Sequence, residues 1–210
     1  ITSNQLAPTS LTSWLSSQGY KLSQQLSLTS LLAFEEELVL SQLIAVDKQY
    51  PLMGKLEIQT VKQKQEVSSG PAEGEIWLEP SLASRLGVSL GDSLEVGATQ
   101  LLVTAWLEAL PDQSSQLINF APKALVAIAS LENSQLLGPY ARFSSQLNLL
   151  SPQTLTTSRV TSKQLSNQQE AIVQFLAKHQ LNAEVKLTNQ QPTAFAHALT
   201  KLQDFMLVFS

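Results

Sequence analysis

Apolar and polar residues alternate along two long segments in the first quarter of the chain. The first covers residues 22–32 and the second residues 34–46. Strand side chains point alternately to the two faces of a sheet, so this period of two predicts two long strands. With the helix before them and a third strand after them, we expect a local arrangement that is antiparallel in its later part. In the second segment the residues expected on one apolar face are Leu38, Leu40, Ile44 and Val46.

A short helix is predicted before these strands, over residues 8–19. Leu11, Trp14 and Leu15 share one helical face, and Gly19 supplies a C-terminal stop.

The stretch Ile44 to Ile58, which reads IAVDKQYPLMGKLEI, indicates a turn between the second strand and a third one. Asp47 can accept a hydrogen bond from the backbone two residues further on, which starts a turn. Pro51 fixes its own φ and favours an extended conformation at Tyr50. Gly54 permits a positive φ, and we expect the third strand to begin there.

Residues 60–73 are polar, lack a period and contain Ser-Ser-Gly-Pro, so they predict a loop or a hinge. Pro80 in a first helical turn and Gly87 as C-cap then mark a short helix. The elements expected after the loop are a strand at 76–78, that helix at 79–86, and strands at 94–96 and 101–108. We predict that residues 60–140 form an inserted β-rich subdomain.

The last third of the chain predicts strand, helix, strand and helix in turn. A strand is expected over residues 141–149, and a capping box of Ser166 and Gln169 is expected to open a helix that runs to His179. Its apolar stripe would be Ile172, Val173 and Leu176. A strand at 185–187 and a helix from Pro192 would follow. Together with residues 1–59, residues 141–210 predict a discontinuous α/β subdomain, so the fold class is α+β.

Composition narrows the range of functions. The net charge is −4 and no basic cluster exists, which argues against nucleic-acid binding. The chain has no cysteine, which excludes disulfides and thiolate catalysis within it. No run of 18 apolar residues is present. The apolar end, residues 205–209, is compatible with the last turns of a buried helix or with the start of a membrane helix, and the start at Ile1 suggests an excised piece of a longer protein or a full protein cleaved from a tag.

Candidate metal chemistry rests on the two histidines, His179 and His197, with Glu184 or Asp204 as the nearby acids. A metal site needs at least a third converging ligand, so ordinary helical histidines are the favoured interpretation and no metal site is predicted.

Candidate catalytic groups have equally plain structural interpretations. Residues 35–37, three glutamates, are expected to be a solvated strand start that blunts an edge. Serine is abundant, but no Gly-x-Ser-x-Gly nucleophile elbow occurs. The run GVSLGD at 87–92 lacks the Lys-Ser/Thr of a phosphate loop. Trp77 and Trp106 could stack a ligand, although core packing is favoured for both, as it is for Trp14. We therefore predict no catalytic, cofactor-binding or metal-binding residue and no cofactor.

Three motifs together resemble a known family. They are AVDxxYPLxGxL at 45–56, GEIWLEPSLASRLGVSLGDSLEVG at 74–97, and NFAPKAL at 119–125. The chain resembles the extracytoplasmic, periplasmic domain of MacB/FtsX-like ABC transporter permeases, which lies between the first two membrane helices. The resemblance implies a two-part periplasmic core at the periplasmic face of the bacterial inner membrane.

The resemblance also implies a function. The domain is expected to transmit ATP-driven motion, so that the permease exports or extracts a hydrophobic compound, a peptide or a lipoprotein. ATP would be hydrolysed by a separate cytoplasmic ATPase subunit, so the domain itself is not expected to be an enzyme. Other expected partners are a second permease domain or protomer and a possible periplasmic protein. The alternative is a soluble periplasmic module that binds a small ligand or lipid, and a serine hydrolase is the third interpretation. The cargo does not follow from the sequence.

Overall fold

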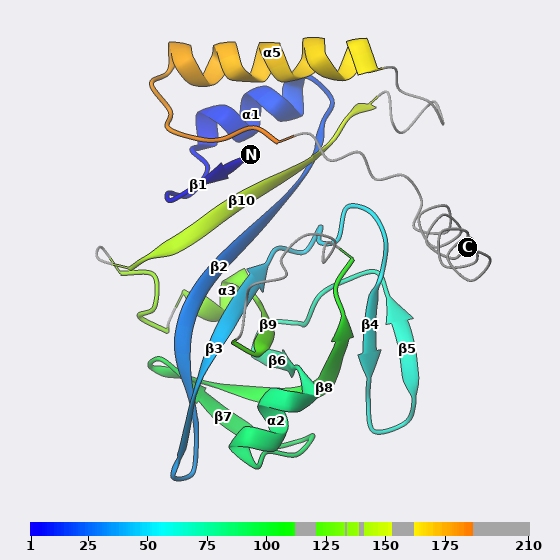
Figure 1. Cartoon of the computed structure of the whole chain (residues 1–210), viewed down its shortest axis with the longest axis vertical. Coiled ribbons are helices and arrows are strands. Elements are labelled where there is room, and N and C mark those ends of the chain that lie inside the picture. Colours follow the sequence, from blue (N-terminus) through cyan, green and yellow to red (C-terminus); the bar gives the residue numbers. More distant parts are fainter. Residues whose placement is uncertain (112–120, 133, 139–140, 153–161, 187–210) are drawn as a thin grey trace, which may run out of the picture.

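The computed structural model of the chain describes residues 1–111, 121–132, 134–138, 141–152 and 162–186. They form one mixed sheet with helices at its ends, which confirms the predicted α+β class (Figure 1). The strands are β1 (Thr2–Ser3), β2 (Lys21–Phe34), β3 (Glu37–Val46), β4 (Leu56–Gln59), β5 (Lys64–Val67), β6 (Glu75–Leu78), β7 (Ser93–Val96), β8 (Thr99–Ala109), β9 (Lys123–Ala127) and β10 (Phe143–Leu150). The helices are α1 (Thr9–Ser17), α2 (Pro80–Leu86), α3 (Ile128–Leu131) and α5 (Ser162–Lys178).

Six of the strands close into a ring. Strand order in the sheet is β1-β10-β2-β3-β9-β6-β8-β4-β5, and β7 pairs with both β2 and β8. The pairings therefore run β2-β3-β9-β6-β8-β7 and back to β2. Only β3 with β9 and β6 with β8 are parallel. Closing a sheet in this way removes exposed strand edges, so the ring is a small barrel.

The barrel encloses the largest apolar cluster. Every strand of the ring contributes to it, and α2 covers one opening with Leu82 and Leu86. A second cluster lies on the outside of β3, β6, β8 and β9, where β4 and Tyr50 cover them. Burial of these alternating side chains on both sides of the strands supplies the main stabilisation of this half of the molecule.

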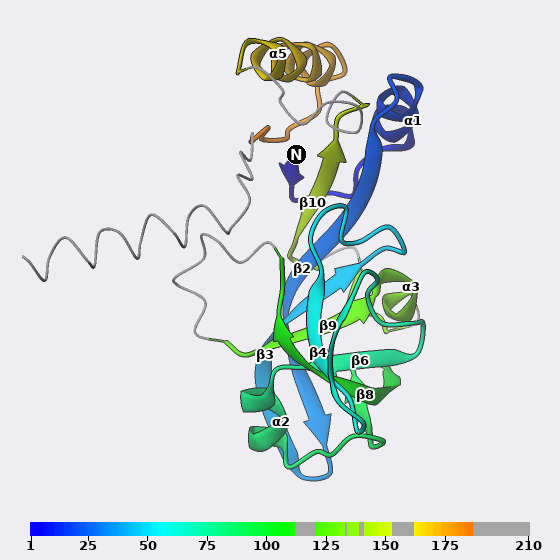
Figure 2. The ribbon, with the colours of Figure 1, turned by 90° about the vertical axis from the view of Figure 1, so that its right-hand side faces the viewer.

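A third cluster lies at the other end of the molecule, between α1, α5 and β10. Its fully buried members are Leu11, Leu15, Leu147, Ile172 and Leu176. Figures 1 and 2 show α1 and α5 around the far ends of β2 and β10, away from the barrel.

The boundary between the two ends falls inside β2 and β10, not in a loop. Leu22 and Leu149 pack with the third cluster, whereas Leu26 and Phe143 pack with the barrel cluster. We call residues 1–22 and 147–186 the helical lobe and residues 26–131 the barrel lobe. The two lobes share the paired strands β2 and β10, which hold them in one sheet.

Most local predictions for the first half of the chain are confirmed. The first helix and the long antiparallel pair of strands are present, and Gly87 ends α2 with a φ of 70°. The second and third strands begin later than predicted. The second strand begins at Glu37, because Glu35, with a φ of 53°, and Glu36 form the hairpin turn, and the third begins at Leu56, two residues after Gly54.

The prediction that residues 60–73 form a loop needs correction, while their role as a hinge stays a prediction. This segment contains β5, which pairs antiparallel with β4. The segment joins β4 to β6, and both of those strands flank β8, so it stays within the barrel lobe. Its polar character has a different cause: β5 is the last strand of the sheet and has exposed side chains on both faces.

Three predictions for the last third need correction. Helix α5 begins at Ser162, so Ser166 and Gln169 lie inside it and do not cap it. Lys163, Gln164 and Leu165 are good helix formers, which explains the earlier start. In the apolar stripe, Ile172 and Leu176 are buried but Val173 is exposed, because it lies about 100° around the helix from Ile172.

Residues 185 and 186, the described part of the strand expected at 185–187, form no strand; the preceding residue, Glu184, forms an isolated bridge with Thr2. The helix expected from Pro192 and the apolar end at 205–209 lie outside the described residues. Within the described ranges, no helix is long and apolar enough to cross a membrane. The division into 1–59 with 141–210 and 60–140 stays a prediction, and we observe that β3 and β4 pack with strands of the 60–140 segment.

Candidate functional site

The segment from Asp47 to Gly54 is built around one carboxylate. Asp47 accepts hydrogen bonds from the Gln24 amide at 2.6 Å, the Ser23 hydroxyl at 2.9 Å and the Gln49 amide at 3.1 Å. The last of these is the predicted bond to the backbone two residues on. Tyr50, almost fully buried, then fills the second apolar cluster. The motif is confirmed as a structural turn that fastens the end of β3 to β2.

The histidine that the structure describes is part of an aromatic stack, not a metal site. The His179 ring lies 4.3 Å from the ring of Phe175. The Glu184 carboxylate forms an exposed ion pair with Lys186 at 3.4 Å. Within the described ranges, no group of three or more potential metal ligands occurs. His197 and Asp204 lie outside those ranges.

The buried serines make structural hydrogen bonds. The Ser23 hydroxyl, fully buried, donates to Asp47, and the Ser41 hydroxyl donates to the Ser30 carbonyl at 3.3 Å. A nucleophile must meet a substrate, so a serine without exposed surface is unsuited to that role. These contacts give the hydrolase interpretation no support.

The tryptophans serve packing. The Trp77 side chain is buried in the second cluster and its indole N–H donates to the Thr104 hydroxyl at 3.0 Å. Trp106 is half-buried against the barrel cluster. Trp14, also half-buried, stacks on Phe175 with ring centroids 4.3 Å apart and so joins α1 to α5.

The other candidate chemistry is likewise structural. In the GVSLGD run, the Asp92 carboxylate accepts a hydrogen bond from the Ser89 amide at 2.8 Å, which confirms a structural turn. Glu35, Glu36 and Glu37 lie at the tip of the β2–β3 hairpin and are exposed.

An open groove lies where the two lobes meet. Its volume is about 610 Å³. Asn4 of the helical lobe lies on one side of it, and Gln42 and Ala121 of the barrel lobe line the other. Its remaining lining residues are Ser27, Leu28, Thr29, Ala141, Arg142, Phe143 and Ser144. Small-molecule sites of this size are mostly apolar, so this predominantly polar groove is better suited to a surface contact.

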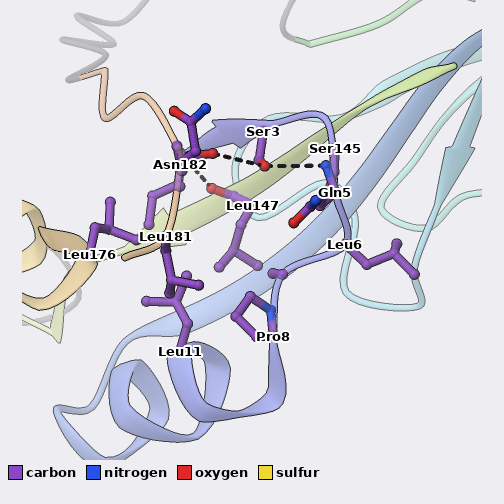
Figure 3. A pocket seen from close by; sticks show the side chains of 13 residues that line it. Ser3, Gln5, Leu6, Pro8, Leu11, Ser145, Leu147, Leu176, Leu181 and Asn182 are labelled. Atoms are coloured by element: carbon purple, nitrogen blue, oxygen red, sulfur yellow. Dashed lines mark hydrogen bonds between the residues drawn. The ribbon is translucent and has the colours of Figure 1, made fainter. Parts of the chain in front are cut away.

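A second, small pocket lies inside the helical lobe and is lined mainly by apolar side chains, among them Leu11, Leu147 and Leu181 (Figure 3). The Ser3 hydroxyl closes one side by donating to the Asn182 carbonyl at 3.1 Å. Its volume of about 30 Å³ holds roughly two water molecules, too few for a lipid or a drug-sized ligand.

Sequence reasoning did not find the interlobe groove. The groove joins residues from five separate segments, and no local pattern marks such a meeting point. One signal was present: Gln42 interrupts the apolar face of Leu38, Leu40, Ile44 and Val46. The structure explains it, because the Gln42 amide donates to the Ser27 hydroxyl at 2.9 Å and both line the groove.

We compared the sequence and the fold of this chain with those of known proteins. No protein-family model matches the chain. It is 25% identical over 125 residues to the uncharacterized ABC transporter permease YbbP of Escherichia coli K12. That match covers 60% of this chain but only 15% of the permease's length.

Two solved structures share the fold. The extracellular domain of the noncanonic ABC-type transporter YknZ from Gram-positive bacteria has a TM-score of 0.54 and 14% identity, and the match covers 87% of this chain and 89% of that one. The periplasmic region of MacB from Actinobacillus actinomycetemcomitans has a TM-score of 0.52 and 13% identity, with 83% and 74% covered. The chain thus has the fold of the extracytoplasmic domains of MacB-like ABC transporter permeases, and its sequence is similar to part of a curated ABC transporter permease.

Proposed function

We propose that this chain is the extracytoplasmic domain of an ABC transporter permease subunit, held at the periplasmic face of a bacterial inner membrane. The observation that carries the proposal is the agreement of two independent comparisons. The fold matches a MacB periplasmic region and a YknZ extracellular domain, and the sequence matches a segment of a permease.

In this proposal the domain transmits motion and catalyses nothing. A cytoplasmic ATPase subunit binds the membrane part of the same protein and hydrolyses ATP. A second permease domain or protomer completes the transporter. The resulting motion of the domain exports or extracts a hydrophobic compound, a peptide or a lipoprotein.

The two lobes supply a physical basis for such motion. Each lobe has its own apolar cluster, and the clusters are joined through β2 and β10. Separately packed bodies move as units, and the deformation falls on the segments between them. We place that deformation between Leu22 and Leu26 on β2 and between Phe143 and Leu147 on β10. Twisting there changes the width of the interlobe groove.

A crosslink across the groove tests this mechanism. The chain contains no cysteine, so Asn4→Cys with Ala121→Cys gives one reactive pair across the groove within it. The matched control is Lys55→Cys with Glu66→Cys, whose native side chains form an ion pair within the β4–β5 region at 2.7 Å. Both pairs are treated with the same flexible bismaleimide in the purified membrane complex.

Crosslinking across the groove should lower ATP turnover at least about fivefold, the lower end of typical coupling between sites, while the ATPase subunit stays bound. The control crosslink should leave turnover unchanged. Unchanged turnover in a fully crosslinked Asn4→Cys/Ala121→Cys complex contradicts the mechanism.

The alternative function, a soluble module for a small ligand or lipid, requires a sizeable apolar pocket. Of the two hollows described above, the apolar one is too small and the large one is polar. Neither of these two hollows in the described part of the chain favours this alternative.

A further inference from the structure

The outward face of the β2–β3 hairpin exposes three neighbouring leucines. Leu31, Leu38 and Leu40 are 53%, 64% and 54% exposed. Leu31 lies directly opposite Leu40 in the strand register, and Leu38 is two residues from Leu40 on the same face. Single exposed leucines are ordinary on protein surfaces, but directly paired ones form a continuous apolar patch.

This patch continues a face that is buried elsewhere. Ile44 and Val46 share the outward face of β3 with Leu38 and Leu40, and the second apolar cluster covers both of them. The second apolar cluster covers this face of β3 at Val46 and Ile44 but not at Gln42. Past Gln42, no described residue buries the three leucines of the patch. On the opposite face of the hairpin Leu32 is fully buried in the barrel, so the exposed leucines are not needed for the core.

Charge lies at the end of the patch. Glu35, Glu36 and Glu37 form the hairpin tip, and none of them is in an ion pair with the described residues. In the other direction Thr29 and Gln42 continue the same face into the interlobe groove, which Arg142 also lines. From the hairpin tip toward the interlobe groove, the surface therefore changes from acidic at residues 35–37 to apolar at the leucine patch and then to polar at Thr29 and Gln42.

We propose that this hairpin face, made of Leu31, Leu38 and Leu40 with residues 35–37, docks an extracytoplasmic partner protein. The partner surface presents apolar side chains with Lys or Arg next to them. Apolar contact supplies the affinity, while opposite charge at the rim sets the orientation and speeds association.

Charge disfavours two other occupants. A second copy of the chain would bring its own three glutamates and the net charge of −4, so like charges would meet. An anionic membrane surface repels the same glutamates. The inference also rests on the proposed function. Figures 1 and 2 show the hairpin tip at the end of the molecule opposite the N-terminus.

Site-specific photocrosslinking in the full-length protein, in its native cells, tests the proposal. The probe is p-benzoylphenylalanine in place of Leu40. Its control is the same probe in place of Val61, which is 82% exposed in the β4–β5 connection. Two double variants test the chemistry: Glu36→Lys with Glu37→Lys, and Leu31→Gln with Leu38→Gln. Because these side chains are exposed, each double variant of the isolated chain should melt within about 2 °C of the parent.

We expect a protein adduct from position 40 and not from position 61. The crosslinked peptide should contain apolar residues within a few positions of Lys or Arg, and each double variant should lower its yield at least about tenfold. An adduct with the mass of two copies, a lipid adduct, a yield insensitive to the charge reversal, or no adduct each overturns the proposal.

The result is separable from the proposed function. If the full-length protein lies in the membrane with an ATPase subunit but position 40 fails these criteria, only the docking inference is wrong. If the protein is soluble and without an ATPase subunit, the proposed function is wrong whatever position 40 shows.

Discussion

Single residues hold the turn that leads from β3 to β4. The Asp47 carboxylate accepts three hydrogen bonds, two of them from β2, and so links the end of β3 to the start of β2. These hydrogen bonds reach β2 between Leu22, which belongs to the helical lobe, and Leu26, which belongs to the barrel lobe. Its neighbours Tyr50 and Gly54 then bury an aromatic ring and reverse the chain.

Replacing Asp47 by alanine should destabilise the chain by about 2–3 kcal/mol, because the buried Ser23 hydroxyl loses its acceptor along with two backbone amides. Chemical denaturation of the isolated chain measures this change. The control is Glu66→Ala, which removes an exposed ion pair and should cost less than about 1 kcal/mol. Equal losses in the two variants would show that the Asp47 bonds are not the cause.

Two glycines have similar backbone conformations but different surroundings. Substituting each of them therefore distinguishes the cost of backbone strain from the cost of a steric clash. Gly54 and Gly74 have φ values of 79° and 84°. A Cβ at Gly54 would lie 2.8 Å from the Pro111 Cβ, whereas nothing lies within 4 Å at Gly74. Gly74→Ala should therefore cost about 1–2 kcal/mol from the left-handed backbone alone.

Gly54→Ala should cost more, about 2–4 kcal/mol, because the clash with Pro111 adds to the strain. Denaturant midpoints of the two variants give the comparison. A Gly54 variant that is no less stable than the Gly74 variant would contradict the packing described around Pro111.

At the scale of elements, α5 joins the rest of the molecule through a narrow contact. Phe175 stacks on Trp14 of α1, and Ile172 and Leu176 complete the third cluster. Outside this contact most side chains from residue 167 to residue 178 of the helix are exposed or half-buried. We expect α5 to open locally before the barrel does.

Phe175→Ala should lower the local opening free energy of α5 by about 1–3 kcal/mol, less than a fully buried Phe→Ala change, since the ring is only partly buried. Hydrogen exchange at α5 amides reports this change, and exchange in β6 and β9 should stay unaffected. Val173→Ala, on an exposed position of the same helix, is the control and should change exchange by less than about 0.5 kcal/mol. Uniform loss of protection across both lobes would refute the idea that the lobes have separate stability.

Elements that depend on residues close to them in the chain were predictable from the sequence. Elements that depend on contacts with residues far away in the chain were not. The helix at α1, the long strands and the Gly87 cap each depend on residues within a few positions, so their patterns reveal them. The true start of the second strand was missed because a run of glutamates hides a hairpin turn. The β5 strand was missed because an edge strand exposed on both faces has no apolar period.

The burial of a strand face is also a tertiary property. Leu38, Leu40, Ile44 and Val46 share one face as predicted, yet only the last two are covered. The period of two identifies the face, but what covers it depends on β4 and Tyr50, which follow later in the chain. The exposed half of that face is the docking surface proposed above.

At the scale of the whole molecule, ring closure had no signal in the sequence, and the interlobe groove had only one, the polar Gln42 within an apolar strand face. Closure depends on pairing Leu32 with Val96 and Ala33 with Glu95, more than 60 positions apart. The shared strands β2 and β10 make the molecule one sheet with two cores. This arrangement suits a domain that deforms between stiff parts, and it needs no catalytic group.

We propose above that this chain belongs to a transporter at the bacterial inner membrane. The most direct test is to fractionate native cells, recover the full-length protein and ask what is bound to it. We expect recovery from the membrane fraction together with a nucleotide-binding ATPase subunit. Recovery from the soluble fraction, without such a subunit, would contradict it.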